Sequence, residues 1–221
     1  MSIFKYFSQE KHALDLINRG RMHWKALSSF REIEDGGIRG DPRDGVLVHA
    51  PEGGLDARGL DGKPVKALAG AKRFVASVKG DDIFVYCTSN IKSDLLFREF
   101  GGFCVEIEDV DKLILMIKAR ECPASKLAYE EITFGSMDYR PLSQIPAADW
   151  ARPEKAVFIK PPEYAPQDEF RIALPKRGAF QAENVELMIE FEGVQKPPPA
   201  IQEPIFIDIG NITDFAKLHR L

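Results

Sequence analysis

The sequence predicts an α+β fold in a single domain, with mostly antiparallel strands in split sheets and three or four helices. Three observations lead to this prediction. The chain of 221 residues is long enough for one substantial core and shows no internal repeat or domain boundary. Short segments of alternating or continuously apolar residues, typical of strands, recur along the chain, as at 83–87 and 185–191. Apolar residues at helical spacing are confined to a few segments.

The N-terminal part is expected to begin with a strand at residues 3–7. Ser8 can cap the helix that follows, and Gly20 can end it, because glycine readily adopts the left-handed conformation found at helix C-termini. A short strand is predicted at residues 22–24. Residues 35–64 are rich in Gly, Asp, Arg and Pro, and they predict a long loop or irregular hairpin that contains a strand at 46–48.

The middle of the chain carries clear local signals. Residues 83–87 are continuously apolar, as expected of a central strand covered on both faces. Ser93 is expected to cap a short helix at 94–100, and Asp109 to cap a second helix. That second helix carries an apolar stripe made of Val110, Leu113, Ile114 and Ile117. Further strands are predicted at residues 74–78 and 103–107.

The C-terminal part is expected to contain more strands than helices. Residues 127–134 predict a strand, and the proline-rich residues 138–166 predict a connecting segment. Another strand is expected at 205–209, after which Asn211 or Thr213 can start a closing helix.

The overall charge gives no general attraction to nucleic acids or membranes, because 34 acidic and 30 basic residues leave a net charge of −4. The N-terminal residues differ locally, since five cations there face few acids. This region can meet a phosphorylated ligand, or it can be an ordinary solvated surface. Its residues are Lys5, Lys11, Arg19, Arg21 and Lys25.

Cysteine and histidine spacing predicts neither disulfides nor a metal site. The three cysteines show no Cys-x-x-Cys pattern and are expected to be reduced and mostly buried, and the four histidines are scattered. Early charges argue against a secretory signal, and no stretch reaches the apolar length of a membrane span. We therefore expect a cytoplasmic protein with no membrane partner.

The run 166–175 lies between two prolines and is the most informative segment about function. Its apolar and polar residues alternate, which predicts a half-buried strand with Gln167 and Glu169 on one face. A carboxylate and an amide at the mouth of a strand suit chemistry at a sugar carbon that becomes cationic. Alternatively, Arg171 is a structural partner of Glu169, and the two form only a salt bridge.

Two other segments carry polar groups at predicted strand positions. Lys5 and Tyr6 lie on the first strand, where an amine can meet ribose or pyrophosphate oxygens and a phenol can make a polar contact. Thr88 and Ser89 follow Cys87 at the end of the central strand and supply hydroxyls. The alternatives are that Lys5 protects an edge strand from pairing and that the hydroxyls belong to a turn.

The order of these segments resembles the ADP-ribosyltransferase superfamily, in which a polar or basic residue on the first strand, a Ser/Thr-rich strand end and a Gln/Glu-x-Glu turn surround NAD. More closely, the chain resembles an uncharacterised bacterial family related to that fold. The matching segments, spread over residues 3–174, are Phe4-Lys5-Tyr6, Ser28-Ser29-Phe30-Arg31-Glu32, Gly102-Phe103-Cys104-Val105-Glu106 and Glu169-Phe170-Arg171. Four positions depart from the pattern. Lys5 stands where the best-known branches carry Arg or His, Cys87 replaces a serine, and Arg31-Glu32 replaces Asn-Asp.

The resemblance implies an ADP-ribosyltransferase-like fold and an enzyme that uses NAD as substrate. Such an enzyme cleaves the nicotinamide–ribose bond and moves ADP-ribose to a macromolecule, either protein or nucleic acid, or to water, in a toxin or phage-defence setting. The alternative is a non-catalytic binding module on the same scaffold, which recognises a protein or nucleic acid through residues 35–64. For the enzyme, the resemblance implies no metal, Glu169 and Gln167 as catalytic residues, and NAD contacts from Lys5, Tyr6, Ser28, Thr88 and Ser89.

Overall fold

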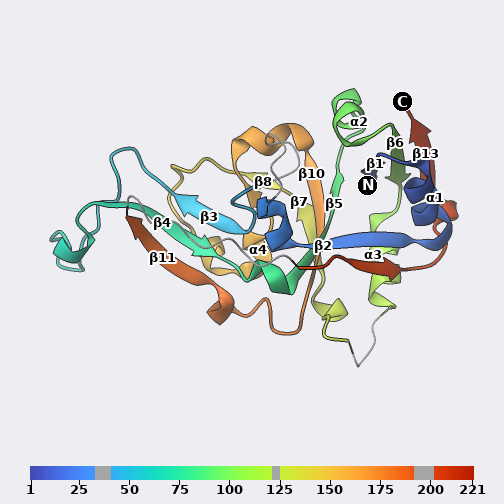
Figure 1. The fold of residues 1–221 in the computed structure, drawn as a ribbon. Coiled ribbons are helices and arrows are strands. Elements are labelled where there is room, and N and C mark those ends of the chain that lie inside the picture. The colour runs from blue at the N-terminus through green and yellow to red at the C-terminus, as the bar shows by residue number, and fades with distance from the viewer. Residues whose placement is uncertain (33–40, 121–124, 192–201) are drawn as a thin grey trace.

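A computed structural model describes residues 1–32, 41–120, 125–191 and 202–221 (Figure 1). Its largest element is an eight-stranded sheet with the main path β12-β2-β5-β1-β6-β13, in which β10 also pairs with β5, and β7 with β10. The strands of this sheet are β1 (Ile3–Phe7), β2 (Arg21–Ala26), β5 (Ile83–Ser89), β6 (Phe103–Ile107), β7 (Thr133–Ser136), β10 (Glu169–Pro175), β12 (Ile205–Asp208) and β13 (Ala216–Arg220).

Two smaller sheets complete the strand arrangement. One has the order β11-β4-β3 and is made of β3 (Val46–His49), β4 (Ala71–Ser77) and β11 (Glu186–Phe191). The other is a parallel pair of β8 (Asp138–Tyr139) and β9 (Ile159–Lys160). All pairings in the two larger sheets are antiparallel, so the predicted α+β class with mostly antiparallel strands is confirmed.

The described α-helices are α1 (Glu10–Arg19), α2 (Asp94–Phe100), α3 (Val110–Lys118) and α4 (Pro153–Ala156), and capping side chains begin α2 and α3. As predicted, the Ser93 hydroxyl accepts a hydrogen bond from the Leu95 amide (3.2 Å), and the Asp109 carboxylate accepts one from the Lys112 amide (2.9 Å). Gly20 ends α1 at φ 61°, also as predicted. The predicted Ser8 cap is wrong, because the helix begins one residue later, after Gln9.

Two hydrophobic cores share β5 and β10. Alternate residues of each strand point to opposite faces. Phe84 and Tyr86 enter a core that α1 and α3 cover, whereas Ile83 and Val85 enter a core shared with β3, β4 and α4. All residues of β10 are buried, so the prediction of a half-buried strand at 166–175 is wrong. The central position predicted for 83–87 is confirmed.

Two strands, β1 and β2, pair with different parts of the same edge of β5, and this arrangement leaves a gap in the sheet between them. β2 pairs with β5 at Phe84 and Val85, and β1 pairs with it at Ser89. Residues 86–88 lie between these two pairings, while the opposite edge of β5 pairs with β10 along its whole length. The edge of β5 at Cys87 therefore faces a gap between β1 and β2.

Two predicted elements differ in type. Residues 127–134 form a single bridge at Leu127, a 3-10 turn at Tyr129–Glu131 and the start of β7, because apolar burial there does not alternate. The closing helix expected near Asn211 is a 3-10 turn (Thr213–Phe215) followed by β13. The Asn211 side chain accepts a hydrogen bond from the Thr213 amide (2.9 Å), a local turn that uses the same residue types as a helix cap.

The segment predicted as a long loop or irregular hairpin is described from residue 41 onward, and 35–40 lie outside the described residues. β3 pairs with β4, and the long connection between them projects from one side of the molecule (Figure 1). An isolated bridge between Arg58 and Pro64 lies within that connection. The described part is therefore an irregular hairpin.

Candidate functional site

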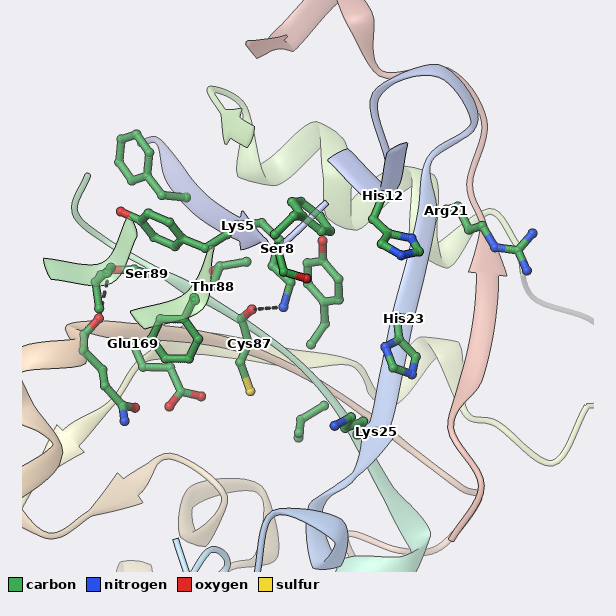
Figure 2. A pocket seen from close by; sticks show the side chains of 18 of the residues that line it. Lys5, Ser8, His12, Arg21, His23, Lys25, Cys87, Thr88, Ser89 and Glu169 are labelled. Carbon is green, nitrogen blue, oxygen red and sulfur yellow. Dashed lines mark hydrogen bonds between the residues drawn. The ribbon is translucent and has the colours of Figure 1, made fainter. Parts of the chain in front are cut away.

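A cleft of about 850 Å³ opens where β1 and β2 separate along β5 (Figure 2). Its walls come from β1, α1, β2, α2 and the ends of β5 and β10. Six of the seven predicted site residues line it, although they come from three distant parts of the chain. They are Lys5, Tyr6, Thr88, Ser89, Gln167 and Glu169.

Lys5 reaches the exposed edge of β5. Its ammonium group donates a hydrogen bond of 2.7 Å to the main-chain carbonyl of Cys87 and lies 4.6 Å from the centre of the Tyr86 ring. Burial lowers the pKa of Lys5, although nearby Glu169 raises it. β1 lies between β5 and β6, so the alternative of an edge-strand guard does not apply. An ammonium group has three donors, so Lys5 keeps donors for a ligand.

Thr88 and Ser89 are the last residues of β5 and do not form a turn. The Thr88 hydroxyl donates to the Phe170 carbonyl (2.9 Å), and the Ser89 hydroxyl donates to the Gln167 carbonyl (2.9 Å). These bonds tie the end of β5 to the entrance of β10. Each hydroxyl oxygen also has acceptor capacity, which in Ser89 is partly used by the Ile91 amide (3.2 Å).

Tyr6 holds the segment that joins β5 to α2. Its hydroxyl donates to the Ile91 carbonyl (3.0 Å) and accepts from the Ser93 amide (2.9 Å), and its ring packs edge-on against Phe97. Burial raises the pKa of Tyr6 to about 12, so the phenol stays protonated at neutral pH. The ring supplies an aromatic wall to the cleft.

Glu169 begins β10 on the floor of the cleft, directly after a sharp turn. Asp168 adopts the left-handed conformation (φ 39°), and Asn90 binds its carbonyl and its carboxylate (2.7 and 2.9 Å). Gln167 ends the preceding 3-10 helix, so it does not share a strand face with Glu169 as predicted. Both side chains nevertheless line the cleft.

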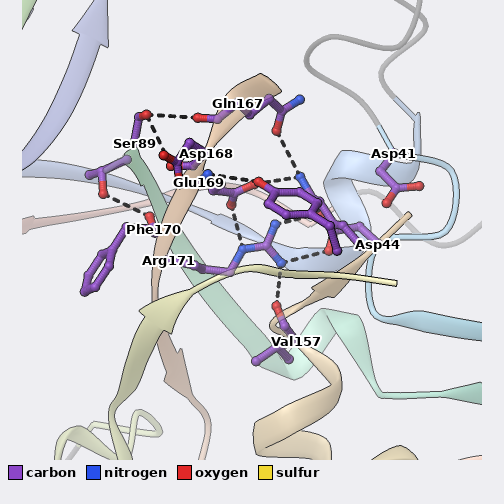
Figure 3. Close-up of polar contacts among 12 residues, drawn as sticks. Asp41, Asp44, Ser89, Val157, Gln167, Asp168, Glu169, Phe170 and Arg171 are labelled. Atoms are coloured by element: carbon purple, nitrogen blue, oxygen red, sulfur yellow. Dashed lines mark hydrogen bonds and ion pairs between the residues drawn. The ribbon is translucent and has the colours of Figure 1, made fainter. Parts of the chain in front are cut away.

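A buried ion network holds the Glu169 carboxylate (Figure 3). One oxygen lies 2.8 Å from Arg171 Nε, and the other lies 2.7 Å from Lys160 Nζ. Arg171 continues into a two-bond pair with Asp44 (2.8 and 2.9 Å). Each of these four side chains is at most 5% exposed. Arg171 and Glu169 therefore form the salt bridge that the alternative interpretation expected, within a larger network that also contains Lys160 and Asp44.

The network fixes the charge of Glu169. Burial alone would raise the pKa of this carboxyl, but Arg171 and Lys160 together hold it well below its usual value. The carboxylate is therefore ionised throughout the physiological pH range. It can stabilise a positive charge on a ligand, but it is too weak a base to take protons near neutral pH.

Lys160 links the two predicted catalytic side chains. Its ammonium group lies 2.7 Å from Glu169 and 3.4 Å from the Gln167 amide oxygen. The sequence interpretation missed Lys160 because it lies in the proline-rich segment 138–166. It also missed Asp44, although an arginine in a strand of apolar residues was a signal for a buried acidic partner.

Ser28 is the predicted NAD-binding residue that the structure does not bring to the cleft. It is 2% exposed and hydrogen-bonded to the Asp81 carboxylate, in the 3-10 turn Leu27–Glu32. Arg31, in the same turn, donates to the Asp44 main-chain carbonyl (2.7 Å). Arg31 therefore helps to hold the segment that carries Asp44.

The cleft is strongly basic. Six lysine or arginine side chains line it, against two carboxylates, in a chain whose net charge is −4. All five cations of the predicted N-terminal basic region are among them: Lys5, Lys11, Arg19, Arg21 and Lys25. The shape and charge of the cleft suit an anionic ligand.

Other chemistries receive no support from the described residues. No group of three or more His, Cys, Asp or Glu side chains there can hold a metal ion. Cys87 lines the cleft, but burial raises the pKa of its thiol to about 12, so it is a poor nucleophile. Cys104 is buried, and Cys122 lies outside the described residues. None of the helices that the structure describes has the length and apolarity needed to cross a bilayer.

Comparison with known proteins finds no match to a family model, a curated protein or a solved structure. The relationship to ADP-ribosyltransferases therefore stays a prediction from short sequence motifs. Any functional proposal rests on the cleft itself.

Proposed function

We propose that this chain binds NAD in the cleft, breaks the nicotinamide–ribose bond and passes the ADP-ribosyl group to a macromolecule or to water. One observation carries the proposal. The permanently ionised carboxylate of Glu169 lies on the floor of a basic cleft lined by hydroxyl, amide and ammonium groups.

The chemistry requires a fixed negative charge more than a proton acceptor. As the bond from ribose C1′ to nicotinamide breaks, its electron pair leaves with nicotinamide, and the ribose becomes cationic. Glu169 stabilises that cation electrostatically. An acceptor oxygen then bonds to C1′ and releases its proton to solvent.

The remaining side chains bind and orient the substrate. Lys5 donates to ribose or pyrophosphate oxygens with the N–H groups that Cys87 does not use. Thr88 and Ser89 accept hydrogen bonds from ribose hydroxyls. Gln167 orients the acceptor through its amide, and Tyr6 provides an aromatic wall.

The test is nicotinamide release by the wild-type protein and two isosteric variants. Glu169→Gln should reduce the rate by about 100-fold or more, the usual effect of removing a group that stabilises transition-state charge. Asp44→Asn is the matched control, because Asp44 belongs to the same buried network but does not line the cleft. It should keep the rate within a few fold at a temperature where both variants are folded. Equal rates for the wild type and Glu169→Gln would refute the assignment.

A second candidate is a binding module that has no catalytic activity. Both Glu169 oxygens are already held by cations, and the hydroxyls of Thr88 and Ser89 donate to main-chain carbonyls. The same contacts would be expected if these side chains served only to stabilise the fold. NAD at about 100 times its dissociation constant adds about 2.7 kcal/mol to the free energy of unfolding. A binding module for macromolecules alone would show no such thermal shift and no nicotinamide release.

A further inference from the structure

One wall of the cleft has no role in the proposed NAD chemistry. It is formed by α1, β2 and the neighbouring β12, and we call it the α1–β2 wall: Lys11, His12, Arg21, His23, Lys25 and Phe206. Alternation along β2 produces it, since Met22, Trp24 and Ala26 point into the core while the residues between them point outward. Residues two apart on a strand lie about 6.6 Å apart, so Arg21, His23 and Lys25 form a row (Figure 2).

The cations of this wall are available to a ligand. Within the part of the chain that the structure describes, neither Lys11 nor Lys25 forms an ion pair with a carboxylate. Arg21 lies 3.8 Å from Asp208, and both side chains are more than a third exposed. Such an exposed pair is weak, because solvent screens it.

The same wall carries an aromatic stack at the edge of the sheet. Phe206 on β12 lies directly opposite His23 on β2, and the two rings stack at 4.8 Å with 12° between their planes. The Arg21 guanidinium lies 4.7 Å from the centre of the Phe206 ring, and Phe206 is 55% exposed. Burial lowers the pKa of His23, as do the neighbouring Lys25 and Lys5, so the ring is neutral at neutral pH.

We propose that the α1–β2 wall binds a single-stranded nucleic acid, whose phosphates meet Lys11, Arg21 and Lys25 and whose bases extend the His23–Phe206 stack. A row of cations beside exposed rings is the arrangement with which proteins hold unpaired strands. In a duplex, the bases stack on one another, so their faces are not available to stack on the His23 and Phe206 rings. The proposal rests on the proposed function in one respect, since it makes this nucleic acid the acceptor of ADP-ribose.

Two other occupants fit the wall less well. The pyrophosphate of NAD can be held near Lys5, which leaves the cations of α1 and β2 and the aromatic stack without a role. An acidic protein segment would match the cations, but it would not need two stacked rings. Nucleic acid uses both features.

Fluorescence anisotropy with labelled single strands of about 12 nucleotides, one of DNA and one of RNA, tests the binding. A polyglutamate peptide of the same length supplies negative charge without bases. At least one of the two strands should bind, and polyglutamate should bind much more weakly than that strand. Three phosphate contacts predict a slope of log K against log salt of about −2 between about 50 and 200 mM salt.

Two variants test the wall itself. Lys11→Glu/Lys25→Glu should weaken binding and lower the salt slope by about 1.4. Its control, Lys66→Glu/Lys126→Glu, makes the same charge change at exposed lysines outside the cleft and should leave both values unchanged. Phe206→Ala should weaken binding by about fivefold or more.

For Phe206, the control is Phe134→Ala, another exposed phenylalanine outside the cleft, which should not change binding. If neither the DNA strand nor the RNA strand bound at low salt, the proposal would be overturned. So would equal affinity for polyglutamate, or unchanged affinity in Phe206→Ala.

The acceptor role has a separate readout. The oligonucleotide should gain the mass of ADP-ribose when NAD is added to the wild-type protein, whereas Glu169→Gln should bind the strand without modifying it. Nicotinamide release without this mass gain would refute the acceptor role. Strand binding without any nicotinamide release would refute the proposed function and leave the binding site standing.

Discussion

Replacing Asp44 with asparagine removes one charge from a fully buried ion network and leaves the shape of the side chain unchanged. Asp44 accepts two hydrogen bonds from Arg171, and both side chains are completely buried. In the variant, Arg171 and Lys160 share the single charge of Glu169. Removing one partner of a buried ion pair costs about 3–5 kcal/mol, because the remaining charge is left without compensation.

The expected shift in melting temperature follows from chain length. For a protein of 221 residues, each kcal/mol removed from the free energy of unfolding lowers Tm by about 2 °C, so Asp44→Asn should lower Tm by about 6–10 °C. The matched control is Asp82→Asn, since Asp82 lies 2.7 Å from its partner, Lys176, close to the 2.8 Å of the Asp44–Arg171 pair, but the two side chains are 39% and 30% exposed. An exposed pair contributes about 0.2–1 kcal/mol, so this control should shift Tm by no more than about 2 °C. Thermal unfolding followed by circular dichroism measures both. Equal Tm shifts for the two variants would refute the reasoning.

Two further predictions concern the floor and the rim of the cleft. Arg171 and Lys160 outweigh burial and hold the pKa of Glu169 below its unfolded value, about 4.3. Its contribution to stability is therefore complete above that pH and is lost as the pH falls toward the folded-state pKa. Urea unfolding should show the stability gap between wild type and Glu169→Gln narrowing below about pH 4.3, and a gap that stays constant down to pH 3 would contradict this. At the rim, Gly101 has φ 128°, and an added Cβ would lie 2.3 Å from main-chain atoms of Phe7 and Ser8 at the end of β1. Gly101→Ala should therefore cost about 2 kcal/mol or more, whereas Gly102→Ala, whose Cβ would meet nothing within 4 Å, should leave Tm nearly unchanged.

Elements with a local signal were predicted correctly from the sequence. Ser93 and Asp109 each cap the expected helix, because a capping hydrogen bond joins residues only two or three apart. The continuous apolar run at 83–87 correctly indicated a strand buried on both faces. These signals are short in range and do not depend on the rest of the fold.

Elements that depend on distant pairing were predicted poorly. The last strand, β13, follows residues that look like a helix start, and it forms because the outer edge of β6 is available to pair with it. The acidic partner of Arg171 was not identified either, since Asp44 is 127 residues away in sequence. Alternation along 169–175 therefore looked like a half-exposed strand.

The candidate site falls between these two cases. The residue types at the ends of β5 and β10 were predicted from the sequence, and the sheet order brings them to one cleft. Lys160 was missed because a lysine within a proline-rich segment looks like a surface residue until its carboxylate partners are known. Ser28 was assigned from a motif alone, and the fold uses it elsewhere.

The charges of Glu169, Arg171, Lys160 and Asp44 also bear on the order in which the chain folds. Asp44 is 127 residues from Arg171 in sequence, whereas Lys160, Glu169 and Arg171 lie close together in the chain. A collapsed intermediate that buried only the latter three would hold an uncompensated charge in a dry interior. Premature compaction around β10 is therefore unfavourable until the segment that carries Asp44 has docked. We expect the network to form late, so that its loss mainly accelerates unfolding and leaves the rate of refolding almost unchanged.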